Sequence, residues 1–279
     1  MLTRLGYLDF INCLPVYFGI LEGKIGINAQ IIKGFPNQLN ALLASGDLDI
    51  SPISSIEYAR HQDEYLLLPD ICLNSEGPVK SVVLISKFPM EMLDNKSIAL
   101  PTTSATSVVL LKILLSHLNI TYEIKPPELS PMLNSSDAAL LIGDDALRIG
   151  KINDLFLYDL AELWQEKTGF PIVFAVWAVR KDYITKFWAG TSPAPTGIID
   201  DITYSLRKSL NYGLANIDKI IDRVLPEFPC VDLWDYFKNL KYEFGARERE
   251  GLLSYYDYAF KLGLCERITV HGLQFTVHG

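Results

Sequence analysis

Histidine and cysteine are scarce in this sequence of 279 residues, which contains four of each. The cysteines lie far apart, at Cys13, Cys72, Cys230 and Cys265. The histidines are equally dispersed, at His61, His117, His271 and His278. Neither a CxxC nor an HExxH spacing occurs. We therefore expect free, buried thiols and no metal site, because metal sites and disulfide frameworks need such clustered residues.

Basic residues are also in the minority, with 25 Lys and Arg against 33 Asp and Glu, for a net charge of −8. Nucleic acid is not expected as a partner, because phosphate neutralisation requires clustered Lys and Arg. An anionic ligand would have to be held by hydrogen-bond donors at its site rather than by the electrostatic field of the whole protein. The nucleotide motifs GxxxxGKS/T and GxGxxG are absent. No nucleophile–base pair can be named from the spacing, which argues against acyl transfer.

Long apolar runs are missing as well. The longest, such as residues 170–179, are too short to cross a bilayer. Asp9 interrupts the apolar stretch that a signal peptide would need after Met1. If Met1 is the native start, these absences predict a cytoplasmic protein with no membrane partner.

Short strand-like and helix-like segments alternate along the chain, and 49% of the residues are hydrophobic, enough for a sizeable core. The expected strands are 5–10, 28–33, 48–51, 81–86, 97–100, 138–142 and 172–179. The expected helices are 14–21, 36–44, about 55–62, 105–118, 198–210, 217–224 and 252–262. This alternation predicts an α/β fold with an open sheet, in which ligands bind at the carboxyl ends of the strands.

Two of the expected strands, residues 81–86 and 172–179, bracket the middle third of the chain. We predict that they carry the chain between two lobes and form a hinge that closes around a ligand. The first lobe would then comprise residues 1–82 and 180–279, and the second residues 83–179. One continuous sheet remains an alternative, because periodicity alone cannot locate a lobe boundary.

The clearest candidate for anion binding is Pro101–Ser107, between a predicted strand and the start of a helix. Free amides, hydroxyl groups and the positive end of the helix dipole suit a carboxylate or a phosphate. Spacing alone favours a simpler explanation, in which Thr103 or Ser104 only caps the helix.

A second polar patch, Ser51–Ser55, also lies where a strand ends and a helix begins. Capping of that helix by Ser54 or Ser55 is at least as well supported by spacing as a role in binding. Convergence of the two patches on one cleft is a hypothesis that the sequence does not show.

Four further positions are chemically suggestive. Asn12 can cap the helix that follows it or present its amide to the crevice, where it can donate and accept at once. Ser81 would face the cleft, although composition alone favours a residue that merely starts a strand. Gly143 and Asp144 are best explained by a tight turn and a helix cap rather than by a metal site. The residues by themselves thus indicate a two-lobed α/β protein that binds a small anion.

Taken together, the segments closely resemble the chorismate dehydratases of the futalosine route to menaquinone. The matching segments are GYLDFINCLP (6–15), GDLDISPISSIEYA (46–59), GPVKSV (77–82), LPTTSATS (100–107), IGDDA (142–146), DLAELW (159–164), TGFP (168–171) and FAVW (174–177). No single segment is specific, but the ordered set is. The resemblance implies a periplasmic-binding-protein type II fold and a cofactor-free lyase that converts chorismate into 3-[(1-carboxyvinyl)oxy]benzoate and water.

The resemblance also implies roles for individual residues. The functional Asn and Ser of that family fall on Asn12 and Ser81 as catalytic residues. The expected substrate contacts are Ser54, Ser55, Ser104, Thr106, Ser107, Gly143 and Asp144. No general base is evident among these residues, so we expect the enolpyruvyl carboxylate of the substrate to take the proton.

Two other functions remain open from the sequence. A sister family, the 1,4-dihydroxy-6-naphthoate synthases, carries a catalytic His after the strand that corresponds to residues 138–142, where this chain has Gly143 followed by Asp144. The same scaffold also serves non-catalytic binding proteins, because fold does not fix function. The oligomeric state cannot be predicted.

Overall fold

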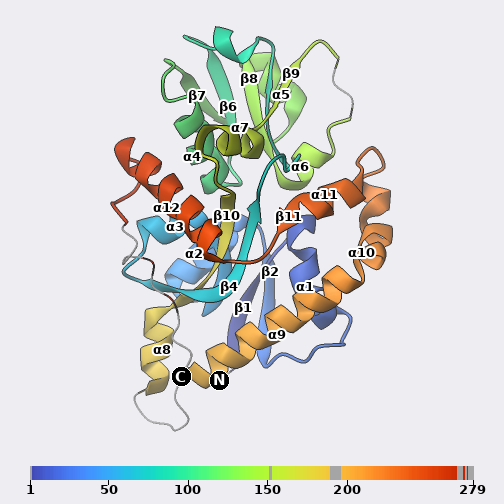
Figure 1. Ribbon diagram of the computed structural model, residues 1–279, viewed down its shortest axis with the longest axis vertical. Coiled ribbons are helices and arrows are strands. Elements are labelled where there is room, and N and C mark those ends of the chain that lie inside the picture. Colours follow the sequence, from blue (N-terminus) through green and yellow to red (C-terminus); the bar gives the residue numbers. More distant parts are fainter. Residues whose placement is uncertain (1, 151–152, 189–195, 269–272, 274, 276–279) are drawn as a thin grey trace.

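The chain forms two mixed β-sheets, one above the other, with helices around both (Figure 1). The computed structural model describes residues 2–150, 153–188, 196–268, 273 and 275. One sheet collects strands from both ends of the chain, whereas the other is built from the middle of the sequence only, within the described residues. The middle segment is therefore an insertion into the first sheet's unit.

Six strands make up the sheet drawn in the lower half of Figure 1. They are β1 (Thr3–Leu8), β2 (Ala29–Gly34), β3 (Ile50–Ser54), β4 (Tyr65–Ser75), β10 (Ile172–Arg180) and β11 (Leu240–Lys241), in the order β11-β4-β10-β3-β1-β2. The early helices of this six-stranded unit are η1 (Ile11–Cys13), α1 (Leu14–Leu21), α2 (Pro36–Ser45) and α3 (Ser55–Arg60). Its later helices are α8 (Lys181–Trp188), α9 (Thr196–Ala215), α10 (Ile217–Val224), η3 (Leu225–Glu227), α11 (Leu233–Asn239) and α12 (Ala246–Lys261).

The second sheet has five strands. They are β5 (Val82–Ser86), β6 (Ser97–Pro101), β7 (Thr121–Lys125), β8 (Ala138–Ile142) and β9 (Phe156–Asp159), in the order β7-β6-β8-β5-β9. The helices of this five-stranded unit are η2 (Met90–Met92), α4 (Ala105–Leu114), α5 (Leu129–Ser135), α6 (Gly143–Leu147) and α7 (Leu160–Thr168).

Two connections between the units run side by side. The chain leaves the six-stranded sheet at Ser75 and returns to it at Ile172, and these two residues are paired neighbours in the antiparallel β4–β10 ladder. The segments expected to carry the chain between lobes become β5 in one sheet and β10 in the other. One continuous sheet is thus not what forms. The exact lobe boundaries, residues 1–82 with 180–279 and residues 83–179, stay a prediction.

Glycine at Gly213 lets α9 lie directly on α1, close to the loop that carries Asn12. A Cβ at Gly213 would come within 2.2 Å of the Pro15 carbonyl oxygen, and one at Gly19 within 3.0 Å of the Ser209 backbone. Close approach of two helices requires such residues without side chains. The contact anchors the start of α1 to the long C-terminal helix.

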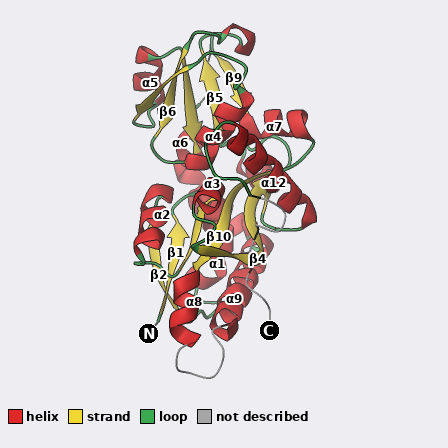
Figure 2. Cartoon of the chain, turned by 90° about the vertical axis from the view of Figure 1, so that its left-hand side faces the viewer, coloured by secondary structure: helices red, strands yellow, loops and turns green. Residues whose placement is uncertain are grey.

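Helix α4 is packed on several sides, as its nearly uniform apolar sequence predicts. It contacts α3, α7, α12 and β10, and Val109, Leu110, Leu111 and Ile113 are buried. Figure 2 shows α3 and α12 at the level between the two sheets. Helix α4 therefore starts at the junction of the two units, although it ends at Leu114 rather than at the predicted Leu118.

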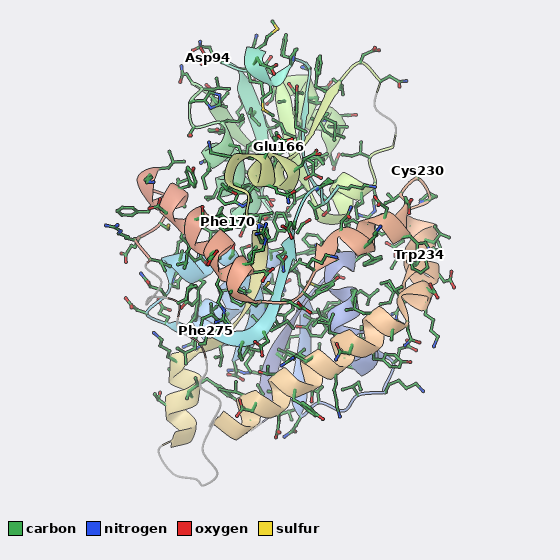
Figure 3. All side chains as sticks on the ribbon, viewed as in Figure 1. Asp94, Glu166, Phe170, Cys230, Trp234 and Phe275 are labelled. Atoms are coloured by element: carbon green, nitrogen blue, oxygen red, sulfur yellow. The ribbon has the colours of Figure 1, made fainter. Side chains whose placement is uncertain are left out.

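The cysteines are free, as predicted, but not all are buried. Cys13 and Cys72 are buried, Cys265 is half-buried and Cys230 is exposed. Cys230 and Trp234 both lie on the side of the molecule formed by α10 and α11 (Figure 3). In the described part of the chain, no helix has the length and apolar character needed to cross a bilayer.

Candidate active site

A small cavity of about 50 Å³, here called the inner cavity, lies between the two sheets. Its polar lining residues are Asn12, Ser54, Ser81, Ser104 and Ser107. Its other lining residues are Leu8, Phe10, Pro36, Pro52, Ile53, Leu73, Val79, Val82, Ile142, Gly143, Phe174, Ala175 and Leu240. None of these described residues is charged. The two polar patches predicted from sequence thus converge on one cavity, together with Asn12 and Ser81.

Asn12 presents its side chain to the inner cavity instead of capping a helix. It lies in η1, and the N-cap of α1 is Cys13, which forms no side-chain cap. The Tyr242 hydroxyl donates to the Asn12 carbonyl oxygen over 2.7 Å and holds the backbone in place. Asn12 Oδ1 is buried and has no hydrogen-bond partner among the described residues. An unpaired buried amide oxygen is costly, so this atom is available to a ligand.

Ser81 and Gly143 meet at one corner of the cavity. The Gly143 amide donates to the Ser81 carbonyl oxygen over 2.7 Å, and Ser81 is 98% buried by the surrounding protein, with 2% of its surface exposed. Gly143 has a φ of 57°, and a Cβ there would lie 3.1 Å from the Phe10 ring. A residue with a side chain would therefore strain the backbone and displace Phe10.

The start of α4 supplies hydroxyl groups and free amides. Ser104 is the N-cap, as the simpler sequence explanation held: its Oγ accepts from the Ser107 amide over 3.4 Å. Ser104 Oγ also donates to Ser107 Oγ over 3.2 Å, and both residues line the inner cavity. The remaining free amides of the first turn and the helix dipole favour an anionic group at this point. Capping and ligand contact are therefore compatible here.

Ser54 and Ser55 have different surroundings at the start of α3. Ser54 occupies the N-cap position without making a side-chain cap, and it lines the inner cavity. Ser55 Oγ instead donates to the Val173 carbonyl oxygen over 2.7 Å and lies 3.2 Å from Thr106 Oγ1. Ser55 and Thr106 are not among the lining residues, so they join α3 to α4 behind the cavity.

Helix α12 also forms hydrogen bonds to this junction of α3 and α4. The Tyr255 hydroxyl donates to the Thr106 carbonyl oxygen over 3.1 Å, and the Tyr256 hydroxyl donates to the Ser55 carbonyl oxygen over 2.7 Å. All four residues are buried. We call Ser55, Thr106, Tyr255 and Tyr256 the hinge cluster, because it links the two units where the chain crosses between them.

Helix α6, which contains Asp144, lies on the side of the junction opposite the hinge cluster (Figure 1). Asp144 does not cap α6, so that prediction is wrong. The N-cap position is Ile142, and the Asp144 carboxylate accepts from the Ile11 amide over 3.2 Å. Burial raises the pKa of Asp144 to about 6, against the opposing effect of the Ile11 N–H. The residue does not line the inner cavity. It connects the five-stranded unit to the segment that carries Asn12.

Tyr236, a wholly buried residue of α11, was not predicted as a site residue. Burial raises its pKa, and the polar side chains of Ser81 and Asn12 act in the opposite direction. None of these approaches reaches full hydrogen-bond geometry at Tyr236 Oη within the described structure. Nothing in the spacing of the C-terminal segment indicates that this hydroxyl reaches the residues at the other end of the chain.

A larger cavity of about 730 Å³, here called the outer basin, adjoins the inner cavity and shares Ile53 and Ser104 with it. Its charged lining residues are Glu57, Arg60 and Lys112, and His61 also lines it. Arg60 pairs with Glu57 over 2.7 Å, and Lys112 lies over the Tyr122 ring at 5.2 Å. These charges are engaged by their own neighbours.

Potential metal ligands do not gather in the part of the chain that the structure describes: no three His, Cys, Asp or Glu side chains there are placed to hold an ion. His271 and His278 lie outside the described residues.

Comparison with known proteins shows the family of this chain. The family model described as menaquinone biosynthesis matches residues 3–261. The chain belongs to this family. It is 32% identical to the chorismate dehydratase of Thermus thermophilus over 273 residues, which cover 90% of this chain and 93% of the relative. It is 21% identical to the 1,4-dihydroxy-6-naphthoate synthase of the same organism, covering 78% of this chain and 77% of that one.

Solved structures confirm the predicted fold class. The periplasmic aliphatic sulphonate-binding protein of Escherichia coli superposes with a TM-score of 0.66 at 12% identity, over 98% of this chain and 97% of that one. The member of the menaquinone biosynthesis family described here therefore has a periplasmic-binding-protein fold. At that level of identity the likeness concerns architecture only.

Proposed function

We propose that this chain is a hydro-lyase that dehydrates chorismate to 3-[(1-carboxyvinyl)oxy]benzoate in menaquinone biosynthesis. Membership of the family and the similarity to the Thermus chorismate dehydratase over nine-tenths of the chain support the proposal. The observation that carries it at the site is the convergence of Asn12, Ser81 and the start of α4 on one uncharged cavity. We further expect the reaction to take place in the cytoplasm.

The reaction needs little from the protein beyond binding and orientation. The C–H bond at the ether-bearing ring carbon breaks, the neighbouring C–O bond breaks, and the departing hydroxide takes up a proton to leave as water. The ring becomes aromatic, which supplies the driving force. Because the lost proton is vinylogous to the ring carboxylate, the electron pair left behind spreads onto that carboxylate before hydroxide leaves.

The start of α4 suits the ring carboxylate, where negative charge grows during the reaction. Preorganised amides, the hydroxyls of Ser104 and Ser107 and the helix dipole stabilise such charge without reorganising. Neutral donors are adequate because the cavity is shielded from water. Away from bulk water, each hydrogen bond to a charged group is stronger.

Asn12 and Ser81 would act at the reacting carbons on the other side of the cavity. Asn12 Oδ1 is the unpaired buried acceptor, and Ser81 offers a hydroxyl that can donate to the departing oxygen. The enolpyruvyl carboxylate of the substrate itself takes the ring proton. Closure of the two units around the substrate would exclude bulk water during these steps.

The inner cavity is too small for a ring compound, at about 50 Å³, so the units must lie further apart than in this structure both when the substrate enters and when it is bound. The hinge cluster holds one side, and the Asp144–Ile11 contact closes the other. Opening on the Asp144 side would break the Ile11–Asp144 hydrogen bond and the exposed Arg148–Glu227 pair. Opening on the hinge side would break several buried hydrogen bonds, which costs more.

The direct test mixes the purified, EDTA-treated protein with chorismate and follows the product by chromatography. We expect stoichiometric conversion to 3-[(1-carboxyvinyl)oxy]benzoate. Unchanged chorismate, under conditions in which calorimetry shows that it binds, would instead indicate a binding protein and would overturn the proposal.

A further inference from the structure

The backbone that carries Asn12 has an unusual hydrogen-bond requirement. Asn12 lines the inner cavity from the short 3-10 helix η1, which α1 follows directly. In a 3-10 helix each carbonyl accepts from the amide three residues further on. For Asn12 that residue is Pro15, which has no N–H to donate. This local bond cannot form, and the Asn12 carbonyl accepts from a distant side chain instead.

The donor is Tyr242, which lies 230 residues further along the chain. Its hydroxyl donates to the Asn12 carbonyl oxygen over 2.7 Å. Both residues are buried, with 4% of the surface exposed for Tyr242 and 9% for Asn12. Because hydrogen bonds weaken steeply with distance and angle, this one fixes the peptide group from which the Asn12 side chain extends.

Tyr242 is itself held firmly by strand β4. Immediately before it, β11 pairs with the end of β4 in an antiparallel ladder. The Cys72 amide donates to the Tyr242 carbonyl oxygen over 3.0 Å, and Asn74 Nδ2 donates to the Glu243 carbonyl oxygen over 3.0 Å. The Tyr242 hydroxyl therefore joins the loop of Asn12 to the six-stranded sheet.

A second contact holds the same loop from the other unit, where the Asp144 carboxylate accepts from the Ile11 amide. That contact links the two units and breaks when they separate on that side. Tyr242 and Asn12 belong to the same unit, so their hydrogen bond does not have to break. From this arrangement we propose that Tyr242 is a positioning residue, whose hydroxyl holds the Asn12 side chain at the reacting carbons of the substrate. The inference rests on the proposed function.

Position matters at Asn12 because its side-chain oxygen is not held by the protein. Asn12 Oδ1 has no hydrogen-bond partner among the described residues, so its place in the cavity depends on the backbone behind it. Without the Tyr242 hydroxyl, that peptide group is free to shift. A displacement of about 1 Å at a reacting centre can lower the rate by about 100-fold. The loss should fall on turnover rather than on binding.

The test compares the wild-type protein with Tyr242→Phe, Asn12→Ala and the double variant, each assayed for kcat and KM with chorismate. We expect Tyr242→Phe to lower kcat by about tenfold or more, with KM within about threefold. Adding Tyr242→Phe to Asn12→Ala should cost less than about twofold further, because no amide is then left to position. Calorimetric counting of chorismate-binding sites refers each kcat to folded protein, so partial unfolding cannot imitate the loss.

Tyr256→Phe is the chemically matched control. The Tyr256 hydroxyl also donates to a buried backbone carbonyl over 2.7 Å, but that carbonyl belongs to Ser55, which does not line the inner cavity. Both variants should lose a few degrees in melting temperature, because each leaves a buried carbonyl without its donor. Only Tyr242→Phe should lose kcat.

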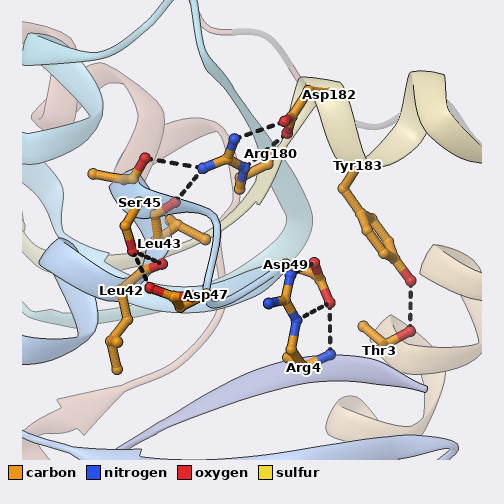
Figure 4. Close-up of polar contacts among 11 residues, drawn as sticks. Thr3, Arg4, Leu42, Leu43, Ser45, Asp47, Asp49, Arg180, Asp182 and Tyr183 are labelled. Carbon is orange, nitrogen blue, oxygen red and sulfur yellow. Dashed lines mark hydrogen bonds and ion pairs between the residues drawn. The ribbon is translucent and has the colours of Figure 1, made fainter. Parts of the chain in front are cut away.

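Tyr183→Phe is a second control, at a distance from the site. The Tyr183 hydroxyl lies 2.6 Å from Thr3 Oγ1 (Figure 4). Tyr183 belongs to α8, at the end of the six-stranded unit away from the five-stranded sheet (Figure 1). This variant should keep the wild-type kcat.

Three results would overturn the inference while the proposed function stands: a Tyr242→Phe kcat within about twofold of an active wild type, an equal loss of kcat in Tyr256→Phe, or multiplicative losses in the double variant. A folded wild type that binds chorismate without converting it would instead contradict the proposed function, and the inference with it. The wild-type assay alone distinguishes the two failures.

Discussion

Ser54 and Ser55 are adjacent in the chain, yet they belong to two regions of the interface between the units. Ser54 faces the inner cavity without capping α3, whereas Ser55 is bonded to Val173 and Thr106 in the hinge cluster. The polar groups of the hinge cluster are satisfied by protein partners. In the inner cavity region, Asn12 Oδ1 and Tyr236 Oη have none within the described structure.

This contrast distinguishes polar groups that stabilise the fold from polar groups that are available to a ligand. Buried polar atoms in proteins are nearly always paired, so an unpaired one that lines a cavity is a candidate contact for a ligand. Asn12 Oδ1 is such an atom in the inner cavity, and Asn40 Oδ1 is one in the outer basin. Cavity volume alone would have indicated the outer basin as the substrate site, because it is far larger, at about 730 Å³. Its charged residues, however, are engaged by one another and by an aromatic ring.

Substitutions at Asn12 and Ser81 should have the largest effect. Asn12→Ala and Ser81→Ala each remove a neutral group that acts on the reacting carbons, and loss of one such preorganised donor typically lowers kcat by about 100-fold or more. Steady-state kinetics with chorismate measures this, with circular dichroism as the check on folding. Rates near those of the wild type for both variants would remove these role assignments and leave the function itself intact.

The neighbouring serines provide a matched pair. Ser54→Ala should raise KM by about tenfold, the equivalent of one hydrogen bond to an ionised group, and leave the melting temperature nearly unchanged. Ser55→Ala should destabilise the fold by about 1–2 kcal/mol, because the buried Val173 carbonyl loses its donor, with KM within about twofold. Chemical denaturation and kinetics on both proteins check this. Interchanged effects would contradict the division between cavity and hinge.

The Asp144 contact should show itself in the pH dependence of stability. The folded pKa of about 6 lies above the ordinary value of 3.8, so between these values the folded protein keeps a proton that the unfolded chain loses. Stability of the wild type should therefore fall as pH rises from about 4 to 6. Asp144→Asn removes this titration and should gain about 1–3 kcal/mol on the wild type across that window.

Urea denaturation of both proteins at several pH values measures the difference. Because asparagine still accepts from the Ile11 amide, Asp144→Asn should keep turnover within about threefold. A stability difference that does not change with pH would show that Asp144 is not held in the desolvated position described here.

Substitutions in the outer basin should have the smallest effect. Arg60→Gln and Lys112→Gln should change kcat/KM by less than about threefold at physiological salt, because charges exposed to solvent are screened. Kinetics over a range of salt concentrations would reveal any steering of the dianionic substrate. A large rise in KM for Lys112→Gln would instead place the substrate in the outer basin.

Much of the fold could be predicted from local patterns. Residues 14–21, 217–224 and 138–142 form α1, α10 and β8 with the predicted bounds. The longest strand, β4, was missed because Pro69 and Asp70 interrupt its apolar run, and proline inside a run argues against a strand. The structure accommodates them in an irregularity of the β4–β10 ladder, with Asp70 at a φ of 60°.

Less of the site than of the fold could be predicted from the sequence. Asn12, Ser54, Ser81, Ser104 and Ser107 line the inner cavity as expected, but their roles stay a prediction. Adjacent hydroxyl residues cannot be told apart by spacing, since a single residue decides whether a side chain faces the cavity or the hinge. The hydrogen bond from Tyr242 to the Asn12 carbonyl oxygen could not be predicted for a different reason. It depends on how the C-terminal segment folds back onto the N-terminal one, which no local pattern encodes.

The account depends on a dianionic ring compound lying in the inner cavity, between the two sheets, held by neutral donors. A crystal structure of Ser81→Ala with chorismate bound tests this most directly. We predict the ring carboxylate at the first turn of α4, and the reacting carbons beside Asn12 and residue 81. Chorismate bound in the outer basin among Arg60 and Lys112, with the inner cavity unfilled, would contradict the account.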